Sequence, residues 1–322
     1  MGTKLELAIG ILNGAVGDFL ARTDNGLATR MTLVHAGATI PTTREALARA
    51  GATGKPRIAV LVHGLMCTES AWTMEEGADY GSLLRRDLGI APLYVRYNSG
   101  LPIPDNGDSL ARLLEQVAEA LPEAAEIIPI GFSMGGLVIR SATHVAATCG
   151  LNWLARVHRA IYCGTPHLGA PLERVGRVVT RILAAVPDPT TKLIGQIANL
   201  RSDGLKDLGD ADLRHDDRAR RGTNIGLRDP RHPVPLLDGI RHHLAAGSLS
   251  IDPRLAGIFG DTVVPLSSGT DGACIDAATI AMPPDNVRIF PGFVHMAMAN
   301  RPEVYVHIRA WCEDDKAKGI DR

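Results

Sequence analysis

A serine set between glycines is the feature of this sequence best suited to covalent chemistry. Ser133 lies between Gly131 and Gly135 in a Gly-x-Ser-x-Gly pattern, with an apolar run before it and residues of helical character after it. In that strand–turn–helix setting the pattern forms a sharp turn that lifts the serine hydroxyl above a sheet, and glycine is needed where neighbouring backbone passes closely. The turn also places the serine at a helix N-terminus, where free N–H groups favour negative charge. Ser133 is therefore the predicted nucleophile.

A serine hydroxyl becomes a good nucleophile when a base removes its proton and an acid orients that base. For serines in this kind of turn the chain order is Ser, then Asp or Glu, then His, so both partners must follow Ser133. His295 follows an expected strand at 286–290, and Asp261 lies in the loop 260–265. Both positions lie beyond the carboxyl ends of strands, where open α/β sheets bind ligands. We predict His295 as the base and Asp261 as the acid.

Four other residues are candidates for a place in this site. Asp252 is the alternative acid, because it is closer to the end of its expected strand, and His307 is a poor base because it lies inside the expected last helix. His63 ends an apolar strand, and we interpret it as a structural residue at the hinge of a loop. His167 either lines the mouth of the pocket or caps the helix that follows it.

Acyl transfer also requires N–H donors for the oxyanion that develops on the carbonyl. The residue after the nucleophile, Met134, is expected to supply one N–H. The second is expected from the loop after the apolar strand 57–62, where Gly64 lets the backbone turn in closely and leaves the Leu65 N–H as donor.

Elements of alternating type must position these residues. Apolar and β-branched runs predict strands, and amphipathic stretches between them predict helices. The predicted strands are 57–62, 92–97, 126–130, 159–163, 243–249 and 286–290, and the predicted helices are 109–121, 135–147 and 303–311. This alternation predicts the α/β class, with a mostly parallel central sheet and helices on both faces.

The alternation is interrupted in the middle of the chain. A helix is expected at 172–186, and residues 201–232 combine seven Arg and one Lys with seven Asp. An irregular loop that long is unusual in a compact domain unless it has a function. We therefore expect a core over residues 51–322 that carries an inserted helical cap or lid at 168–241.

Residues 1–50 precede that core and are expected to hold a helix and the first strands. Apolar residues between Leu5 and Leu20 recur at helical spacing. The plainer interpretation is a helix packed on the domain. The alternative is a helix that docks on a lipid surface or a partner.

Composition excludes several classes of function. The chain has 322 residues, a net charge of −1, 34 Lys and Arg against 35 Asp and Glu, and 4% aromatic residues. The near-neutral balance argues against binding nucleic acid, and the small share of aromatics argues against stacking single-stranded bases. No apolar stretch is long enough for a membrane span. Neither a metal-ligand pattern nor a cofactor motif is present, so we expect neither a metal nor a cofactor.

Cysteines and the N-terminus bear on the compartment. The five cysteines are widely spaced and contain no Cys-x-x-Cys, which predicts free thiols in a reducing compartment. Charged and polar residues interrupt the N-terminal apolar positions, so no signal peptide is evident. We expect a cytoplasmic protein.

These motifs together resemble the α/β-hydrolase family. More narrowly, they resemble its lipase and esterase branch, which includes bacterial triacylglycerol lipases and PGAP-type, GPI-inositol-deacylase-like hydrolases. The resemblance is carried by Val62-His63-Gly64-Leu65, Gly131-Phe132-Ser133-Met134-Gly135-Gly136, Gly164-Thr165-Pro166-His167-Leu168-Gly169-Ala170-Pro171, Gly260-Asp261-Thr262-Val263-Val264-Pro265 and His295. It spans most of residues 57–312. It implies a nucleophilic Ser133 with acid Asp261 and base His295, and an acyl pocket under an inserted lid.

Two departures from the family pattern bear on the substrate. The segment expected to form the lid is rich in Arg and Asp, and Thr262 stands where the family usually has glycine. Met66, His167 and Leu168 are the candidate substrate-binding residues.

The predicted function is therefore a carboxylesterase or lipase that forms an acyl-enzyme on Ser133. Its substrate is expected to be a small-molecule or lipid ester, with peripheral contact to a lipid surface. Two alternatives remain: acyl transfer or thioester hydrolysis by the same groups, and a catalytically silent binding scaffold that uses the lid as a partner surface.

Overall fold

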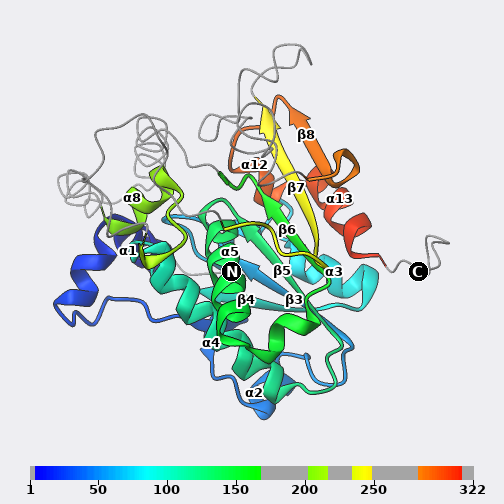
Figure 1. Ribbon diagram of the computed structural model, residues 1–322, viewed down its shortest axis with the longest axis horizontal. Coiled ribbons are helices and arrows are strands. Elements are labelled where there is room, and N and C mark those ends of the chain that lie inside the picture. The colour runs from blue at the N-terminus through cyan, green and yellow to red at the C-terminus, as the bar shows by residue number, and fades with distance from the viewer. Residues whose placement is uncertain (1–3, 168–201, 217–233, 249–281, 314–322) are drawn as a thin grey trace.

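One twisted sheet forms the centre of the molecule. The computed structural model describes residues 4–167, 202–216, 234–248 and 282–313 (Figure 1). The strands are β1 (Thr32–His35), β2 (Ala38–Ile40), β3 (Arg57–Val62), β4 (Ala91–Arg96), β5 (Glu126–Phe132), β6 (Arg159–Cys163), β7 (Arg241–Ser248) and β8 (Val287–Pro291). Their order is β2-β1-β4-β3-β5-β6-β7-β8. β1 is antiparallel to β2 and β4, and all other neighbours are parallel. The predicted mostly parallel sheet is confirmed.

Helices cover both faces of this sheet. They are α1 (Lys4–Arg22), α2 (Arg44–Arg49), α3 (Tyr80–Leu88), α4 (Ile103–Ala120), α5 (Met134–Cys149), α8 (Asp203–Asp210), α12 (Ala297–Asn300) and α13 (Pro302–Cys312). Short 3-10 turns lie at η1 (Glu69–Trp72), η2 (Asn152–Arg156) and η3 (Pro284–Asn286). The six strands predicted with bounds are confirmed within two residues at each end. Helices α2 and α3 were not predicted.

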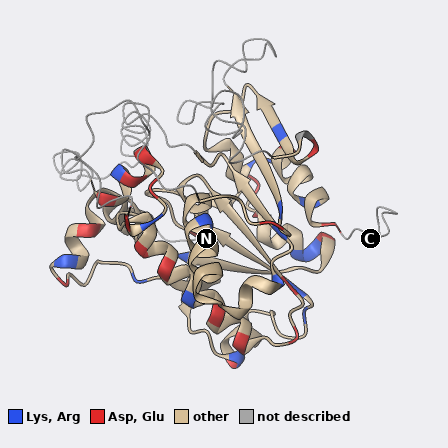
Figure 2. Cartoon of the chain, viewed as in Figure 1, with Lys and Arg blue, Asp and Glu red and all other residues tan. Residues whose placement is uncertain are grey.

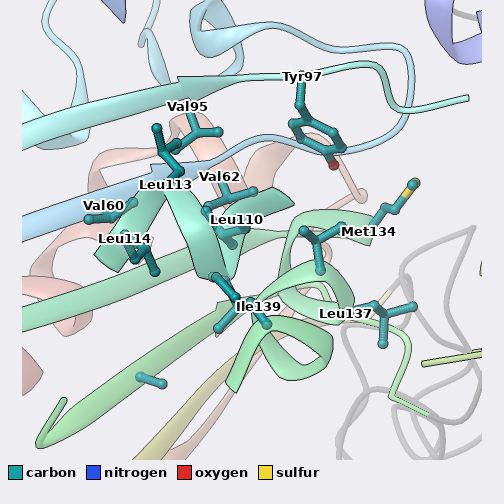
Figure 3. Packing of buried hydrophobic residues seen from close by; sticks show 14 of the residues in the cluster. Val60, Val62, Val95, Tyr97, Leu110, Leu113, Leu114, Met134, Leu137 and Ile139 are labelled. Carbon is teal, nitrogen blue, oxygen red and sulfur yellow. The ribbon is translucent and has the colours of Figure 1, made fainter. Parts of the chain in front are cut away.

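Two apolar cores lie on opposite faces of the sheet because successive strand residues point in opposite directions. In β3, Ile58, Val60 and Val62 belong to the core under α1, α4 and α5. Ala59 and Leu61 belong to the core under α3, α12 and α13. Figure 3 shows part of the first core, where side chains of β3, β4, α4 and α5 meet. A strand buried on both faces explains why the sequence of β3 is apolar throughout.

The start of α4 differs from the prediction. The helix was expected to begin at residue 109 but begins at Ile103, after Pro102. Its first N–H has a distant partner, because Asp207 Oδ2 accepts a hydrogen bond from Ile103 N at 2.9 Å. Asp207 is fully buried. A cap supplied by a residue far along the chain leaves no local signal at the helix start.

Pro129 lies inside the central strand β5, where proline is rare. It is opposite Val60 of β3, and the ladder to β6 begins one residue later, at Ile130. The strand therefore accommodates the missing N–H where its pairing with β6 has not yet begun.

The N-terminal helix is confirmed as α1, but the face that the apolar spacing indicated packs only in part. Val16 and Leu20 are buried, whereas Leu5 and Phe19 are 68% and 53% exposed. Small residues form half of the buried face: Gly10, Gly14, Ala15 and Gly17. The helix is kinked at Val16, whose φ of −142° is not helical.

Part of the charge-dense segment is helical and packed. α8 contacts α1 and α4, and Ser202 caps it by accepting a hydrogen bond from Leu205 N at 3.3 Å. The predicted helix at 172–186 lies outside the described residues. Basic and acidic residues are interspersed along the outer helices (Figure 2). Within the described residues, no helix combines the length and apolar character that crossing a membrane requires.

Candidate active site

Ser133 occupies a strained turn between β5 and α5. Its φ and ψ are 53° and −123°, a conformation that non-glycine residues rarely adopt. Such a conformation costs about 1–3 kcal/mol and persists where the surroundings impose it. The Ser133 N–H donates to the carbonyl oxygen of Cys163 at 2.8 Å, which ties the turn to the end of β6. This is the strand–turn–helix geometry that the sequence predicts around Ser133.

The glycines beside Ser133 leave no room for a side chain. A methyl group at Gly131 would lie 2.5 Å from Gly136 Cα, and one at Gly135 would lie 2.5 Å from the carbonyl oxygen of His63. The obstructing atoms are backbone and cannot rotate away. The prediction that backbone passes closely at Gly131 and Gly135 is confirmed.

His295 lies in the loop after β8, and only 4% of it is exposed. Its ring centroid is 5.1 Å from that of Phe132, the residue before Ser133. A methyl group at Gly164 would lie 3.3 Å from His295 Nδ1. The hydrogen bond from Ser133 N to the Cys163 carbonyl joins the end of β5 to the end of β6. Ser133 and His295 therefore lie close together, at the ends of β5, β6 and β8.

The two predicted oxyanion donors lie near Ser133. Met134 begins α5, and Leu65 follows Gly64, at which an added methyl group would lie 3.0 Å from Ser133 Cβ. Both residues are buried. Among the described residues, no hydrogen-bond acceptor is found for the Leu65 N–H or the Met134 N–H. Within the described part of the chain, both N–H groups are therefore available as donors near Ser133.

His63 is held between backbone groups. Its ring stacks on Tyr97 at 4.4 Å, and its Nδ1 lies 2.8 Å from the carbonyl oxygen of Gly64. Burial lowers the pKa of His63 to about 4, so the ring is neutral near pH 7. Tyr97 N donates to Nε2 at 3.4 Å, and Tyr97 Oη donates to the His63 carbonyl at 2.8 Å. These contacts agree with the structural role that the sequence suggested.

His167 is buried rather than open to a pocket mouth. Arg140 Nη1 lies 3.1 Å from its Nδ1, and its ring meets that of Tyr162 edge-on at 4.8 Å. Burial, followed by the charge of Arg140, holds the pKa of His167 well below its usual range. In this structure the histidine belongs to a buried polar cluster under α5.

The remaining candidates divide into described and undescribed residues. Met66 is buried in the turn 64–67 that follows β3, next to Leu65. His307 lies in α13 with its ring 5.5 Å from that of Phe290. Asp261, its alternative Asp252, and Leu168 lie outside the described residues. The acid of the triad therefore stays a prediction.

Sequence reasoning missed the residues that hold the oxyanion loop. Met66 has a positive φ of 59°, and its N–H donates to Ser99 Oγ at 3.0 Å. No local pattern indicates this, because methionine is not a residue that favours positive φ. The glycines of α1 did carry a signal: they recur at positions 10, 14 and 17, the spacing of one helix face.

Neighbouring thiols are poor competitors for the serine. Cys67 is the last residue of the turn 64–67, and burial raises the pKa of its thiol to about 12. Burial also raises the pKa of the Cys163 thiol well above its usual range. A thiol is nucleophilic as its thiolate, so neither sulfur is activated. No group of three or more potential metal ligands occurs within the described part of the chain.

Comparison with known proteins adds three solved structures of low sequence identity. No protein-family profile matches the sequence, and no curated protein sequence matches it. The mature lipase BlEst2 of Bacillus licheniformis is 19% identical, over 79% of this chain and 92% of that one, with a TM-score of 0.48. An esterase of Thermogutta terrifontis is 17% identical (80% and 90%; TM-score 0.40). An esterase of Pyrococcus furiosus is 11% identical (80% and 82%; TM-score 0.45).

Proposed function

We propose that this protein is a serine carboxylic-ester hydrolase that acts through an acyl-enzyme on Ser133. The observation that carries the proposal is the strained, buried Ser133 near the Leu65 and Met134 N–H groups, for which the described residues provide no acceptor. Strain of this kind persists only where the surroundings impose it, and it often marks a functional site. Two N–H donors near a nucleophile are what a tetrahedral oxyanion requires.

The reaction proceeds in two steps. Ser133 Oγ attacks the ester carbonyl as His295 accepts its proton, and the Leu65 and Met134 N–H groups stabilise the oxyanion. The C–O bond to the alcohol then breaks, and His295 returns the proton to the leaving alkoxide. Water, deprotonated by His295, then attacks the acyl carbonyl. The bond between the acyl carbon and Ser133 Oγ breaks, His295 returns the proton to Ser133 Oγ, and the acid is released. Asp261 is the group that we propose to orient His295 and stabilise its cation.

Replacement of the nucleophile tests the proposal directly. Ser133→Ala is expected to lower kcat on aryl esters by about 10⁵–10⁶-fold, because the residual rate comes from binding and the oxyanion hole alone. Circular dichroism should show an unchanged fold. Wild-type rates in this variant would rule the mechanism out.

A fluorophosphonate probe provides the second arm. It is expected to label the wild-type protein at Ser133 and to leave Ser133→Ala unlabelled. An absence of labelling in the folded wild-type protein would favour the binding-scaffold alternative. Competition between water and an added alcohol separates hydrolysis from acyl transfer, because transfer produces a new ester.

The acyl-chain preference is the next property to define. We propose that the preferred esters are long or aggregated, with an acyl pocket under the inserted segment 168–241 and peripheral contact to lipid. The exposed Leu5 and Phe19 of α1 support lipid contact. Rates should rise from acetate to octanoate esters. A flat or falling series would identify a small-ester enzyme.

A further inference from the structure

The oxyanion loop is a tight turn in a conformation that its own sequence does not favour. The turn runs from Gly64 to Cys67, and it is closed by a hydrogen bond from Cys67 N to the Gly64 carbonyl at 3.3 Å. Met66 occupies its third position with φ of 59°. Turns with a positive φ at this position normally use glycine or asparagine there. A buried methionine in their place is strained, and something outside the turn must hold it.

Two contacts hold Met66, and both come from elsewhere in the chain. Ser99, after β4, accepts the Met66 N–H at 3.0 Å. Gly14 of α1 lies directly against the Met66 backbone: a methyl group there would be 2.8 Å from both Met66 N and Met66 Cα. The backbone of α1 at Gly14 therefore limits the position of the Met66 backbone.

α1 is in turn fixed at the same point. Ser202 Oγ donates to the Gly14 carbonyl at 2.7 Å, and Asn98 Nδ2 donates to the Gly17 carbonyl at 2.9 Å. The kink at Val16 lies within the turn that would close on the Gly14 carbonyl, which leaves that carbonyl available to Ser202. The next helical glycine, Gly10, lies against Thr68 and Cys67.

Space beside the loop makes this contact important. A pocket of about 330 Å³ lies between α1 and the loop, and its lining includes Ile9, Gly10, Cys67, Thr68 and Tyr97. Residues 67–68 adjoin both this pocket and Gly10 of α1. The contacts at Met66 bear most directly on the Leu65 N–H, because Met66 is the next residue in the turn.

We propose that α1 is a positioning element of the oxyanion hole. Gly14, together with Ser99, holds Met66 in its strained conformation and thereby fixes the direction of the Leu65 N–H. The inference rests on the proposed function, in which that N–H stabilises the oxyanion. Gly14 and Ser99 touch no substrate and act through the turn.

Gly14→Ala and Ser99→Ala test this role, with Leu20→Ala as the matched control. Leu20 is a buried residue of the same helix, and its truncation weakens the packing of α1 away from the loop. Each variant is measured for kcat and KM on an aryl ester, for melting temperature, and for affinity to an alkyl boronic acid. The boronic acid adds reversibly to the serine as a tetrahedral anion and so reports on the oxyanion hole.

Gly14→Ala is expected to lower kcat by at least about tenfold, with KM within twofold, since loss of one oxyanion donor costs about 10²–10³. Boronate affinity should fall by the same factor as kcat/KM. Ser99→Ala should show the same pattern to a smaller degree. Leu20→Ala should lower the melting temperature and leave kcat and boronate affinity within twofold.

Three outcomes would overturn the inference. A folded Gly14→Ala with kcat within twofold of wild type is one, and an equal loss of kcat in Leu20→Ala is another. If Gly14→Ala does not fold, Ser99→Ala decides, and unchanged kcat and boronate affinity in that variant count against the role. Failure of the proposed function has a different signature: wild type would not hydrolyse the ester, or Ser133→Ala would match it, and both ideas would then fall.

Discussion

At the scale of single residues, the site is defined by what surrounds Ser133 as much as by the serine. Gly64, Gly131, Gly135 and Gly136 each face atoms within 3.0 Å of where a methyl group would stand. At Gly131 and Gly135 those atoms are backbone. The strain at Ser133 is thus maintained by contacts that only glycine permits.

Gly131→Ala is expected to destabilise the protein by about 1–3 kcal/mol and to disrupt the elbow, because its methyl group would overlap Gly136. Gly26→Ala is the control, since nothing lies within 4 Å of a methyl group at Gly26. Urea denaturation measures both. Equal stability of the two variants would contradict the steric argument.

The residue types and their order along the chain were enough to predict the sharp turn at Ser133, the close approach at its glycines and a loop carrying His295 after β8. The conformation of Met66 could not be predicted, because the contacts that impose it come from Gly14 and Ser99, far away in the sequence. The burial of His167 was not predicted for a similar reason: its partner Arg140 lies on α5, a different element of the chain.

At the scale of elements, a buried ion pair joins the sheet to the last helix. Arg159 Nε lies 2.7 Å from Glu126 Oε1, and Arg159 Nη1 donates to the Trp311 carbonyl at 2.7 Å. Arg57 Nη1 donates to the Cys312 carbonyl, also at 2.7 Å. The last carbonyls of α13 are therefore capped by arginines of β3 and β6.

Arg159→Met is expected to cost about 3–5 kcal/mol, because it leaves the carboxylate of Glu126 buried without its partner. Arg44→Met removes an exposed ion pair to Glu123 and should cost much less, because exposed ion pairs contribute little to stability. Urea denaturation of both variants checks the contrast. Adding Glu126→Gln to Arg159→Met should recover part of the loss, and a further loss instead would contradict the explanation.

The elements themselves were predictable in unequal measure. Strands buried on both faces gave continuous apolar runs, and their bounds were accurate. The packing face of the N-terminal helix α1 was predicted only in part, because some of its close packing uses glycines, which hydrophobic spacing does not detect. The early start of α4 depends on Asp207, within a segment expected to serve only as a lid.

At the scale of the whole molecule, buried neutral histidines make stability depend on pH. Burial lowers the pKa of His63 and His242 to about 4 and holds that of His167 well below its usual range. Unfolding returns each to its ordinary value near 6.5, so the unfolded chain binds protons that the folded chain does not. Stability should therefore fall as pH drops from about 6.5 to about 4.

The slope should approach about 1.4 kcal/mol per pH unit for each such histidine. His63→Gln is expected to reduce the slope of the free energy of unfolding against pH by the contribution of one histidine. Urea denaturation between pH 7 and 4.5 measures this slope. A slope unchanged from wild type would show that His63 titrates normally in the folded protein.

The crowding around Ser133 has a genetic consequence. Any nucleotide change that replaces a glycine with another amino acid adds at least a Cβ atom, so no missense change at Gly131 or Gly135 is mild. A scan of single substitutions should therefore find inactivating variants at these glycines as often as at Ser133. The mutational target of the activity is larger than its set of reacting groups.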